Sequence, residues 1–387
     1  MDVSPEVYRD IVRNVGRRSD IATLARVCKG FRIAAQRALY NTLIVGEADV
    51  ELCGTLVTSP RLASLVIALT VQMGRLEEEE DEEDDAPVEE TEAEERTTRS
   101  SSDRRRSGEK SSPSPNPAWT TIAGALRNTT RLRHLTVDIA DLADFPNAWV
   151  LAGCTFQLHT FHCDFDWDQP LLEFLATQTE LHDLFIRDYV DLGTAQSPTL
   201  PSLSALECTF TEAAATLTPG RPISRLKTCF SHTDAVGRRA ELVAVLAALR
   251  LSTGPIYALD IADGIYTEPA SMELLHKIAH TPATASELRY LGTLALPVGG
   301  RKRLQFYGLL MRLRRLRCLE VDISQWSPPP TSSPALRALA AELRLYCPDV
   351  STVVFVHEFE RTVVNTTLGS VLKIDDAAAP ESMWREI

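Results

Sequence analysis

Metal binding is the first chemistry that the histidines and cysteines of this sequence suggest. His276 and His280 are four residues apart, so on a helix both rings would lie on one face and could chelate a metal ion. No carboxylate pattern accompanies them, which favours an ordinary solvated helix face. His159 and Cys163 would point to one side of a strand and His162 to the other, which disfavours a shared metal. We therefore predict no metal site and no cofactor.

Catalytic motifs with a fixed spacing are absent from the sequence. It contains no G-x-x-x-x-G-K-[ST] phosphate loop, no H-E-x-x-H zinc helix, no G-x-S-x-G nucleophile turn and no calcium-binding EF-hand loop. The sequence offers no other candidate set of nucleophile, acid and base. We expect a non-catalytic protein without catalytic residues.

A basic run at residues 301–317 could contact phosphate groups. It contains Arg301-Lys302-Arg303 and further arginines at positions 312, 314, 315 and 317. On a surface helix these residues would instead face solvent and complement the negative end of the helix dipole. The formal net charge of −13 disfavours nucleic acid as a partner. The longest apolar-biased stretch, residues 62–73, is too short to cross a membrane, which takes about 20 residues. We expect neither nucleic-acid nor membrane binding.

Most of the negative charge belongs to one segment. Residues 77–95 contain fourteen acidic side chains among nineteen residues, and a Ser- and Arg-rich stretch follows. Such a composition cannot bury enough apolar surface to offset the loss of chain entropy on folding. We therefore predict a disordered acidic and Ser-rich insertion over residues 76–115.

The rest of the sequence repeats the pattern apolar-x-x-apolar-x-apolar, which is typical of a short strand with one buried face. A first copy, Val66/Leu69/Val71, is 26 residues from Leu132 once the forty residues 76–115 are left out, so the insertion should interrupt a continuous array. Later copies begin 20 to 34 residues apart. They are Leu132/Leu135/Val137, Leu158/Phe161/Cys163, Leu181/Leu184/Ile186, Leu203/Leu206/Cys208, the weaker Ile223/Leu226, Ile256/Leu259/Ile261, Leu288/Leu291, Leu316/Leu319/Val321 and Val350/Val353/Phe355.

Helices are expected before many of these strands, because apolar residues recur there at intervals of three and four. They are residues 119–126, 171–177, 242–249, 272–278, 304–313 and 336–346. Alternating helix and strand at this period resembles the leucine-rich repeat, whose units of about 20–29 residues stack into a solenoid. The expected fold class is α/β, with parallel strands in a solenoid. A doubly wound α/β domain would show the same alternation and is the alternative, although no Gly-rich phosphate loop follows any strand.

Three short helices are predicted in the first forty-five residues. Ser4-Pro5-Glu6 can begin the first, because Ser caps a helix, Pro suits its first turn and Glu favours its positive end. Gly16 ends this helix. Ser19-Asp20 begins the second helix, Gly30 ends it, and the third extends to Tyr40. So short a unit buries little surface, and it should complete its core against the repeats or against a partner.

The three helices resemble an F-box, and they look most like fungal F-box proteins in which leucine-rich repeats follow. The resemblance covers about residues 3–45. Its residues are Pro-Glu-Val-Tyr-Arg-Asp-Ile-Val from Pro5, Asp-Ile-Ala-Thr-Leu-Ala-Arg-Val-Cys-Lys-Gly-Phe-Arg from Asp20, and Ala-Leu-Tyr from Ala38. Val3-Ser4 stands where the family usually has Leu-Pro.

In that family the F-box binds the Skp-family linker of cullin ubiquitin ligases. The resemblance implies contacts with this linker at Pro5, Glu6, Ile11, Val27, Cys28 and Phe31. A second interpretation is that the helices cap the end of the solenoid, as terminal repeats must.

Target binding is expected on the concave face of the solenoid, where the residues that alternate with the apolar anchors point. Acidic side chains outnumber basic ones among them, which favours a basic partner. We expect this partner to carry an aromatic or aliphatic anchor near Phe185 and Tyr290; the alternative is that these are ordinary solvated strand residues. The candidate residues are Asp138, His162, Asp164, Asp183, Phe185, Glu207, Asp260, Tyr290 and Glu320.

The expected organisation is an F-box-like module (1–45), a first repeat (46–75), the insertion (76–115), a leucine-rich-repeat solenoid (116–360) and a C-terminal cap or tail (361–387). The eight scattered cysteines, with no C-x-x-C pair, favour a reducing compartment, cytoplasmic or nuclear. The resemblance implies a substrate-recognition adaptor that joins the Skp-family linker, and through it a cullin, to an unknown target protein. A repeat scaffold unconnected to ubiquitin and a degenerate α/β enzyme are the alternatives.

Overall fold

The computed structural model describes residues 4–74, 117–139, 148–187, 197–367 and 371–387. The predicted acidic insertion, residues 76–115, lies outside the described residues. Within them the fold is α/β, and no helix is long and apolar enough to cross a membrane.

One mostly parallel sheet runs through the molecule, with its strands in chain order. Each strand from β1 to β10 pairs in parallel with the strand that follows it. The pairs β11–β12 and β12–β13 are antiparallel. The strands are β1 (Thr42–Val45), β2 (Ala68–Met73), β3 (His134–Ile139), β4 (Thr160–Cys163), β5 (Asp183–Ile186), β6 (Ala205–Phe210), β7 (Arg225–Cys229), β8 (Ala258–Ala262), β9 (Tyr290–Ala295), β10 (Cys318–Asp322), β11 (Thr352–His357), β12 (Glu360–Thr367) and β13 (Val371–Ile374).

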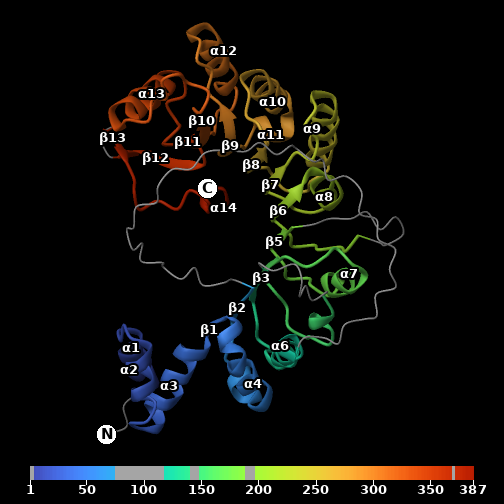
Figure 1. The fold of residues 1–387 in the computed structure, drawn as a ribbon, viewed down its shortest axis with the longest axis vertical. Coiled ribbons are helices and arrows are strands. Elements are labelled where there is room, and N and C mark those ends of the chain that lie inside the picture. Colours follow the sequence, from blue (N-terminus) through green and yellow to red (C-terminus); the bar gives the residue numbers. More distant parts are fainter. Residues whose placement is uncertain (1–3, 75–116, 140–147, 188–196, 368–370) are drawn as a thin grey trace, which may run out of the picture.

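The sheet curves into an arc, with its strands on the inner side and the connecting helices on the outer side (Figure 1). The α-helices are α1 (Pro5–Arg13), α2 (Arg18–Leu24), α3 (Lys29–Tyr40), α4 (Val50–Thr58), α5 (Pro60–Ala63), α6 (Pro117–Asn128), α7 (Gln169–Ala176), α8 (Thr211–Leu217), α9 (Ala235–Arg250), α10 (Glu268–His280), α11 (Pro282–Ala285), α12 (Gly300–Leu310), α13 (Ser333–Tyr346) and α14 (Met383–Glu386). A doubly wound sheet would reverse its strand order and carry helices on both faces. The described strands keep their chain order and the helices that connect them lie on the outer side, so that alternative is wrong.

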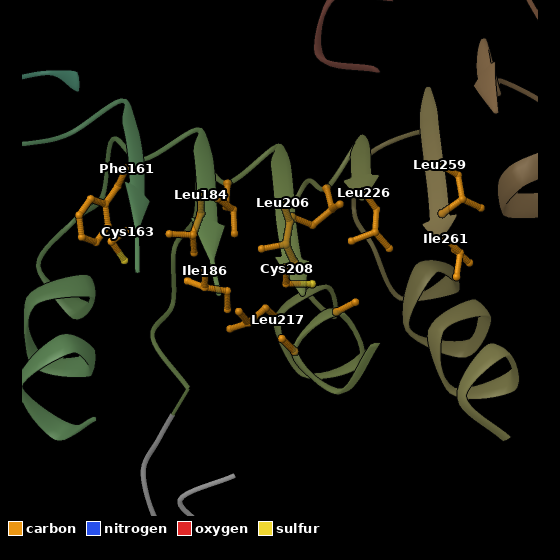
Figure 2. Close-up of a cluster of buried hydrophobic side chains, with 14 of the residues drawn as sticks. Phe161, Cys163, Leu184, Ile186, Leu206, Cys208, Leu217, Leu226, Leu259 and Ile261 are labelled. Carbon is orange, nitrogen blue, oxygen red and sulfur yellow. The ribbon is translucent and has the colours of Figure 1, made fainter. Parts of the chain in front are cut away.

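The main core lies between the sheet and the outer helices. One apolar side chain from each of β1 to β11 stands in register with the next, and each is at most 3% exposed. Figure 2 shows five of these anchors side by side, from Phe161 in β4 to Leu259 in β8. Burying each such side chain contributes about 1.5–3 kcal/mol, so stacking the strands in chain order stabilises the whole array. The anchors are Leu43, Leu69, Leu135, Phe161, Leu184, Leu206, Leu226, Leu259, Leu291, Leu319 and Val353.

The strands on either side of residues 75–116 are direct neighbours in the sheet. β2 pairs with β3 in parallel, with Leu69 opposite Leu135 and Val71 opposite Val137. The prediction that the array continues across the acidic segment is therefore confirmed.

The N-terminal helices have a small core of their own. Val12, Ala34 and Ala35 are buried there, and Tyr8 packs edge-on against Phe31 with ring centroids 4.8 Å apart.

Two sequence predictions about these helices were wrong. Gly30 does not end the second helix but lies in the first turn of α3, where a Cβ atom would come within 2.4 Å of the Tyr8 ring. The second helix begins at Arg18 instead of Ser19-Asp20. The tight contact between α1 and α3 therefore requires glycine at position 30.

The end of the sequence departs from the expected boundary at residue 361. That position lies inside β12, so residues 361–367 and 371–374 continue the sheet instead of forming a cap. Only the last residues leave the sheet, and they place α14 on the inner side of the arc (Figure 1). We call residues 375–387 the tail.

Candidate interaction surfaces

The N-terminal helices expose several apolar side chains. Val7 and Ile11 of α1 are 44% and 43% exposed, whereas Val12 of the same helix is buried. Val27 is 64% exposed in the turn before α3. Apolar side chains held outside the core of so small a unit are typical of a docking surface.

The predicted linker contacts are mostly accessible in the structure. Pro5, Glu6, Ile11, Val27 and Cys28 are exposed. Phe31 is not fully accessible, because Tyr8 covers part of its ring.

A cleft of about 640 Å³ lies beside these residues, and its walls include Pro5 and Tyr8 of α1 and Ile33 of α3. Ile33 is 62% exposed and was not singled out from the sequence.

Cys28 has a local structural role. Its Sγ accepts a hydrogen bond from the backbone N–H of Phe31 at 3.5 Å, and so caps the N-terminus of α3. That hydrogen bond lowers the pKa of the exposed thiol. The Val-Cys-x-x-aromatic turn therefore fixes where α3 begins.

The concave face of the sheet is occupied by the tail. Arg385 reaches across strands β4 to β6, which are far away in the sequence. Its Nε donates to Asp183 at 3.0 Å, and its Nη2 donates to Glu207 at 2.6 Å and lies 3.4 Å from His162 Nε2. Side chains from three neighbouring strands thus converge on one guanidinium group.

Each acidic residue at this site has a second cationic or imidazole partner. His162 Nε2 lies 3.4 Å from Asp183, and Lys227 Nζ lies 2.9 Å from Glu207. Burial by itself would raise the pKa of Asp183, but the hydrogen bond from His162 and the charge of Arg385 outweigh it and lower the pKa. The site therefore stabilises ionised carboxylates in a half-buried setting.

Trp384 fills the concave face next to this ion-pair site. Its side chain is 1% exposed and belongs to a separate cluster on the inner side of the sheet. The small residues Ala205, Ala258 and Cys318 leave room for the indole ring, and Lys227 Nζ lies 6.0 Å from the ring centroid. The tail thus contributes an aromatic anchor beside an arginine.

Two carboxylates lie deeper under the tail. Glu320 accepts hydrogen bonds from the Tyr290 hydroxyl at 2.6 Å and the Thr293 hydroxyl at 2.9 Å. Asp260 is buried, and this burial together with nearby Glu320 raises its pKa to about 7. A Cβ atom on Gly292 would come within 1.9 Å of Asp260 Oδ1, so glycine is needed where β9 passes this carboxyl.

Most of the predicted concave residues are not free surface in the structure, and their role in target binding stays a prediction. Tyr290, Asp260 and Glu320 are 1%, 5% and 2% exposed, and Tyr290 shares a buried cluster with Trp384 of the tail. His162, Asp183 and Glu207 contact Arg385, and Asp164 is buried with Arg187 3.2 Å away. Of the nine candidates, Asp138 is exposed and Phe185 is half-buried without a contact to Arg385.

The sequence analysis missed Trp384 and Arg385. The available signs of a docked segment were Trp384, an aromatic residue that follows Ala-Pro-Glu-Ser-Met, and the small concave residues of β8 and β10. Nothing in the spacing indicates that Arg385 meets Asp183, 202 positions earlier.

A cluster formed by α8, α9 and the loop before α9 has the residue types of a metal or catalytic site. Glu212, His232 and Glu241 bring ligand atoms within 4.8 Å of one another. Buried Glu241 already accepts hydrogen bonds from the backbone N–H groups of Ser231 and His232 at 3.2 and 3.1 Å. Ser231 and Glu241 both contact Nδ1 of His232, whereas a catalytic triad uses opposite ring nitrogens. The cluster therefore holds the loop in place.

The histidine pair on α10 forms no recognisable metal site. The His276 and His280 rings stack with centroids 4.1 Å apart, and His280 Nδ1 lies 2.7 Å from the His276 carbonyl oxygen. Within the described part of the chain, no third ligand joins them.

The basic run is partly neutralised. Lys302, Arg303 and Arg315 pair with Glu268, Glu342 and Glu287.

Comparison with known proteins adds no family. No protein-family model matches the sequence, and no curated protein matches it.

Proposed function

We propose that this protein is a substrate-recognition adaptor of a Skp–cullin–F-box type ubiquitin ligase. In this role the N-terminal helices bind the Skp-family linker, and the curved sheet, as a leucine-rich-repeat solenoid, holds the target. The observation that carries the proposal is the exposure of Val7, Ile11 and Val27 on helices that resemble an F-box and have their own core. The adaptor itself catalyses no reaction.

The shape of the chain suits such an adaptor. The N-terminal helices lie at one end of the arc, and the strands line its inner side (Figure 1). A continuous parallel sheet is stiff, so a target held on this face would stay at a defined distance from a ligase docked on the helices. The rate of ubiquitin transfer would then rise through effective concentration.

The concave face supports a basic target. Asp138 on β3 is exposed, and no salt bridge involves it among the described residues. Asp183 and Glu207 bind an arginine in the structure already. These carboxylates would favour a partner rich in lysine and arginine.

Co-purification of the full chain with a Skp-family linker and a cullin tests the proposal. Ile11→Asp and Val27→Asp place a charge on exposed positions, so they should abolish linker binding without unfolding the chain. Leu345→Asp is the matched control, because Leu345 is 82% exposed on α13 at the far end of the sheet. It should bind the linker as the wild type does.

Failure of the wild-type chain to bind the linker would contradict the ligase role and favour a scaffold unconnected to ubiquitin. Equal loss of linker binding in Ile11→Asp, Val27→Asp and Leu345→Asp would contradict the assignment of the docking surface.

A further inference from the structure

The tail contacts the concave face as a bound peptide would. Asp375, the first residue of the tail, donates its backbone N–H to the Val363 carbonyl of β12 at 2.9 Å; among the described residues, no backbone hydrogen bond joins residues 376–387 to any part of the chain before the tail. The backbone hydrogen bonds of this segment are internal, such as Ser382 to Ala379 and Ile387 to Met383. The segment is held instead by side chains, above all the indole of Trp384 and the guanidinium of Arg385.

Both carboxylates of the ion-pair site keep a further neighbour when Arg385 leaves. Glu207 keeps its ion pair with Lys227, and Asp183 keeps the 3.4 Å contact with His162 Nε2. Glu207 thus avoids the costly outcome of a charge left without a counter-charge, and Asp183, whose side chain is 20% exposed, would be open to solvent once the tail leaves. The sheet can therefore exist with this site vacated.

The indole site would be different after the tail leaves. Trp384 shares one buried cluster with Ala258, Tyr290, Cys318 and Val354, and this cluster would lose its cover on the concave side. Exposed apolar surface beside carboxylates fits an aromatic side chain with an arginine next to it. The fit of the tail is imperfect, because Trp384 Nε1 is buried without a hydrogen-bond acceptor in the described chain.

We propose that the concave face recognises a target segment with an aromatic residue next to an arginine, and that Trp384 and Arg385 occupy this site as an internal competitor. The target displaces the tail and takes over its contacts with Asp183, Glu207 and the indole site. This inference rests on the proposed role of the concave face in target binding. To that role it adds the residue pattern of the target, an aromatic residue next to an arginine, and the displacement of the tail that exposes the concave site.

The exposed acid Asp138 gives a target an advantage over the tail. Arg385 reaches strands β4 to β6, and no contact links the described tail to Asp138 on β3. A longer basic segment can place a further cation there while it fills the Trp384 and Arg385 positions.

Peptide binding to the full chain tests this inference. The probe is a fluorescein-labelled peptide of residues 378–387, and fluorescence polarisation measures its affinity for wild type and for Arg385→Ala. We expect the Arg385→Ala chain to bind the probe at least tenfold more tightly, because its own tail is the weaker competitor. A chain that ends at Ala377 should bind it more tightly still.

Controls identify the contacts that matter. In the Arg385→Ala chain, Asp183→Asn should weaken binding at least tenfold. Glu273→Gln should leave binding unchanged, because Glu273 lies on the outer helix α10 and pairs there with Arg239 of α9. A scrambled unlabelled peptide that keeps Trp and Arg adjacent should compete with the probe, whereas one that separates them should not.

Three results would overturn the inference: no binding to either the Arg385→Ala chain or the shortened chain, equal binding to wild type and Arg385→Ala, or equal competition by both scrambled peptides. Linker co-purification is measured on the same chains. Loss of linker binding with intact peptide binding contradicts only the ligase role, and the reverse result contradicts only the displacement of the tail.

Discussion

The two halves of the concave face differ, although the same kind of strand builds both. In β3 to β5 the burial alternates residue by residue, and the concave side chains are accessible or half-buried. In β9 and β10 every residue is buried, on both faces of the sheet. The outer helices cover one face in both halves. On the concave face Tyr290 and Cys318 share a buried cluster with Trp384, so the tail contributes to the burial of this covered half. A strand of this sheet can therefore keep its helix-side anchor whether its concave face is open or covered.

Substitutions on the helix side should not distinguish the two halves. Leu184 in β5 and Leu291 in β9 occupy equivalent anchor positions and are 0% and 2% exposed. We expect Leu184→Ala and Leu291→Ala each to lower the free energy of unfolding by about 3 kcal/mol, through lost burial and the cavity that remains. Urea denaturation measures both. A difference above about 2 kcal/mol between them would contradict a uniform helix-side core.

On the concave side, removal of one hydroxyl group should cost more stability in the covered half than in the accessible half. Tyr290→Phe removes a buried hydrogen bond to the Glu320 carboxylate, and it should cost about 2 kcal/mol. Thr160→Val removes the exposed contact between Thr160 Oγ1 and His134 Nδ1 in the open half, and it should cost less than about 0.5 kcal/mol. Equal costs in thermal or urea denaturation would contradict the burial of β9 under the tail.

The pH dependence should reveal the buried carboxyl in the covered half. Because the pKa of Asp260 is raised to about 7, the folded chain retains a proton that the unfolded chain loses above about pH 4. Its contribution to stability therefore falls as the pH rises from about 4 to about 7. Burial is the main cause, and Glu320, Lys227, Arg361 and Glu207 surround the group. Asp260→Asn should raise stability more at pH 8 than at pH 5; an equal effect at both would contradict the raised pKa.

Asp183 in the accessible half, where Arg385 contacts it, should show a pH dependence of the opposite sign. Its pKa is lowered in the folded chain, so its contribution is present above the unfolded pKa of about 3.9 and is lost as the pH falls through the lower folded value. Asp183→Asn should therefore destabilise the chain more at pH 7 than at pH 3. Denaturation midpoints at the two pH values measure this, and a larger loss at pH 3 would disprove it.

A modest gain in stability is expected at the turn between β11 and β12, outside both halves. Glu358 and Phe359 have positive φ angles of 48° and 73°, in a two-residue hairpin that favours Asn-Gly. Replacing them with Asn and Gly should stabilise the chain by about 1 kcal/mol. Phe359 is 96% exposed, so its removal sacrifices no core contact. A lower melting temperature would contradict the turn geometry.

The helix side of the fold was largely predictable from the sequence. Even the weak copy Ile223/Leu226 marks a strand, because the period-2 burial of apolar residues is a local property. The short helix α8 was not expected: its Ala-rich sequence follows β6 directly and carries no clear apolar stripe. Local patterns thus identify each repeat and its anchors.

The candidate site was predictable only in part. Its acidic strand residues follow from alternation along β4 to β6, and an aromatic anchor beside a basic group was expected of a target. That the chain itself supplies both depends on a contact between Arg385 and Glu207 across 178 positions. No local sequence pattern predicts such a contact, because it forms between the tail and a strand that are far apart in the sequence.

The reactivity of Cys318 tests most directly whether the tail covers the concave half. Cys318 lies in the cluster with Trp384, whereas Cys163 lies in the helix-side core, and both are 0% exposed. Thiol labelling followed by mass spectrometry should show both protected in the wild type. In Trp384→Ala we expect Cys318 to be labelled at least tenfold faster while Cys163 stays protected. Unchanged protection of Cys318, or simultaneous labelling of both cysteines, would contradict this account.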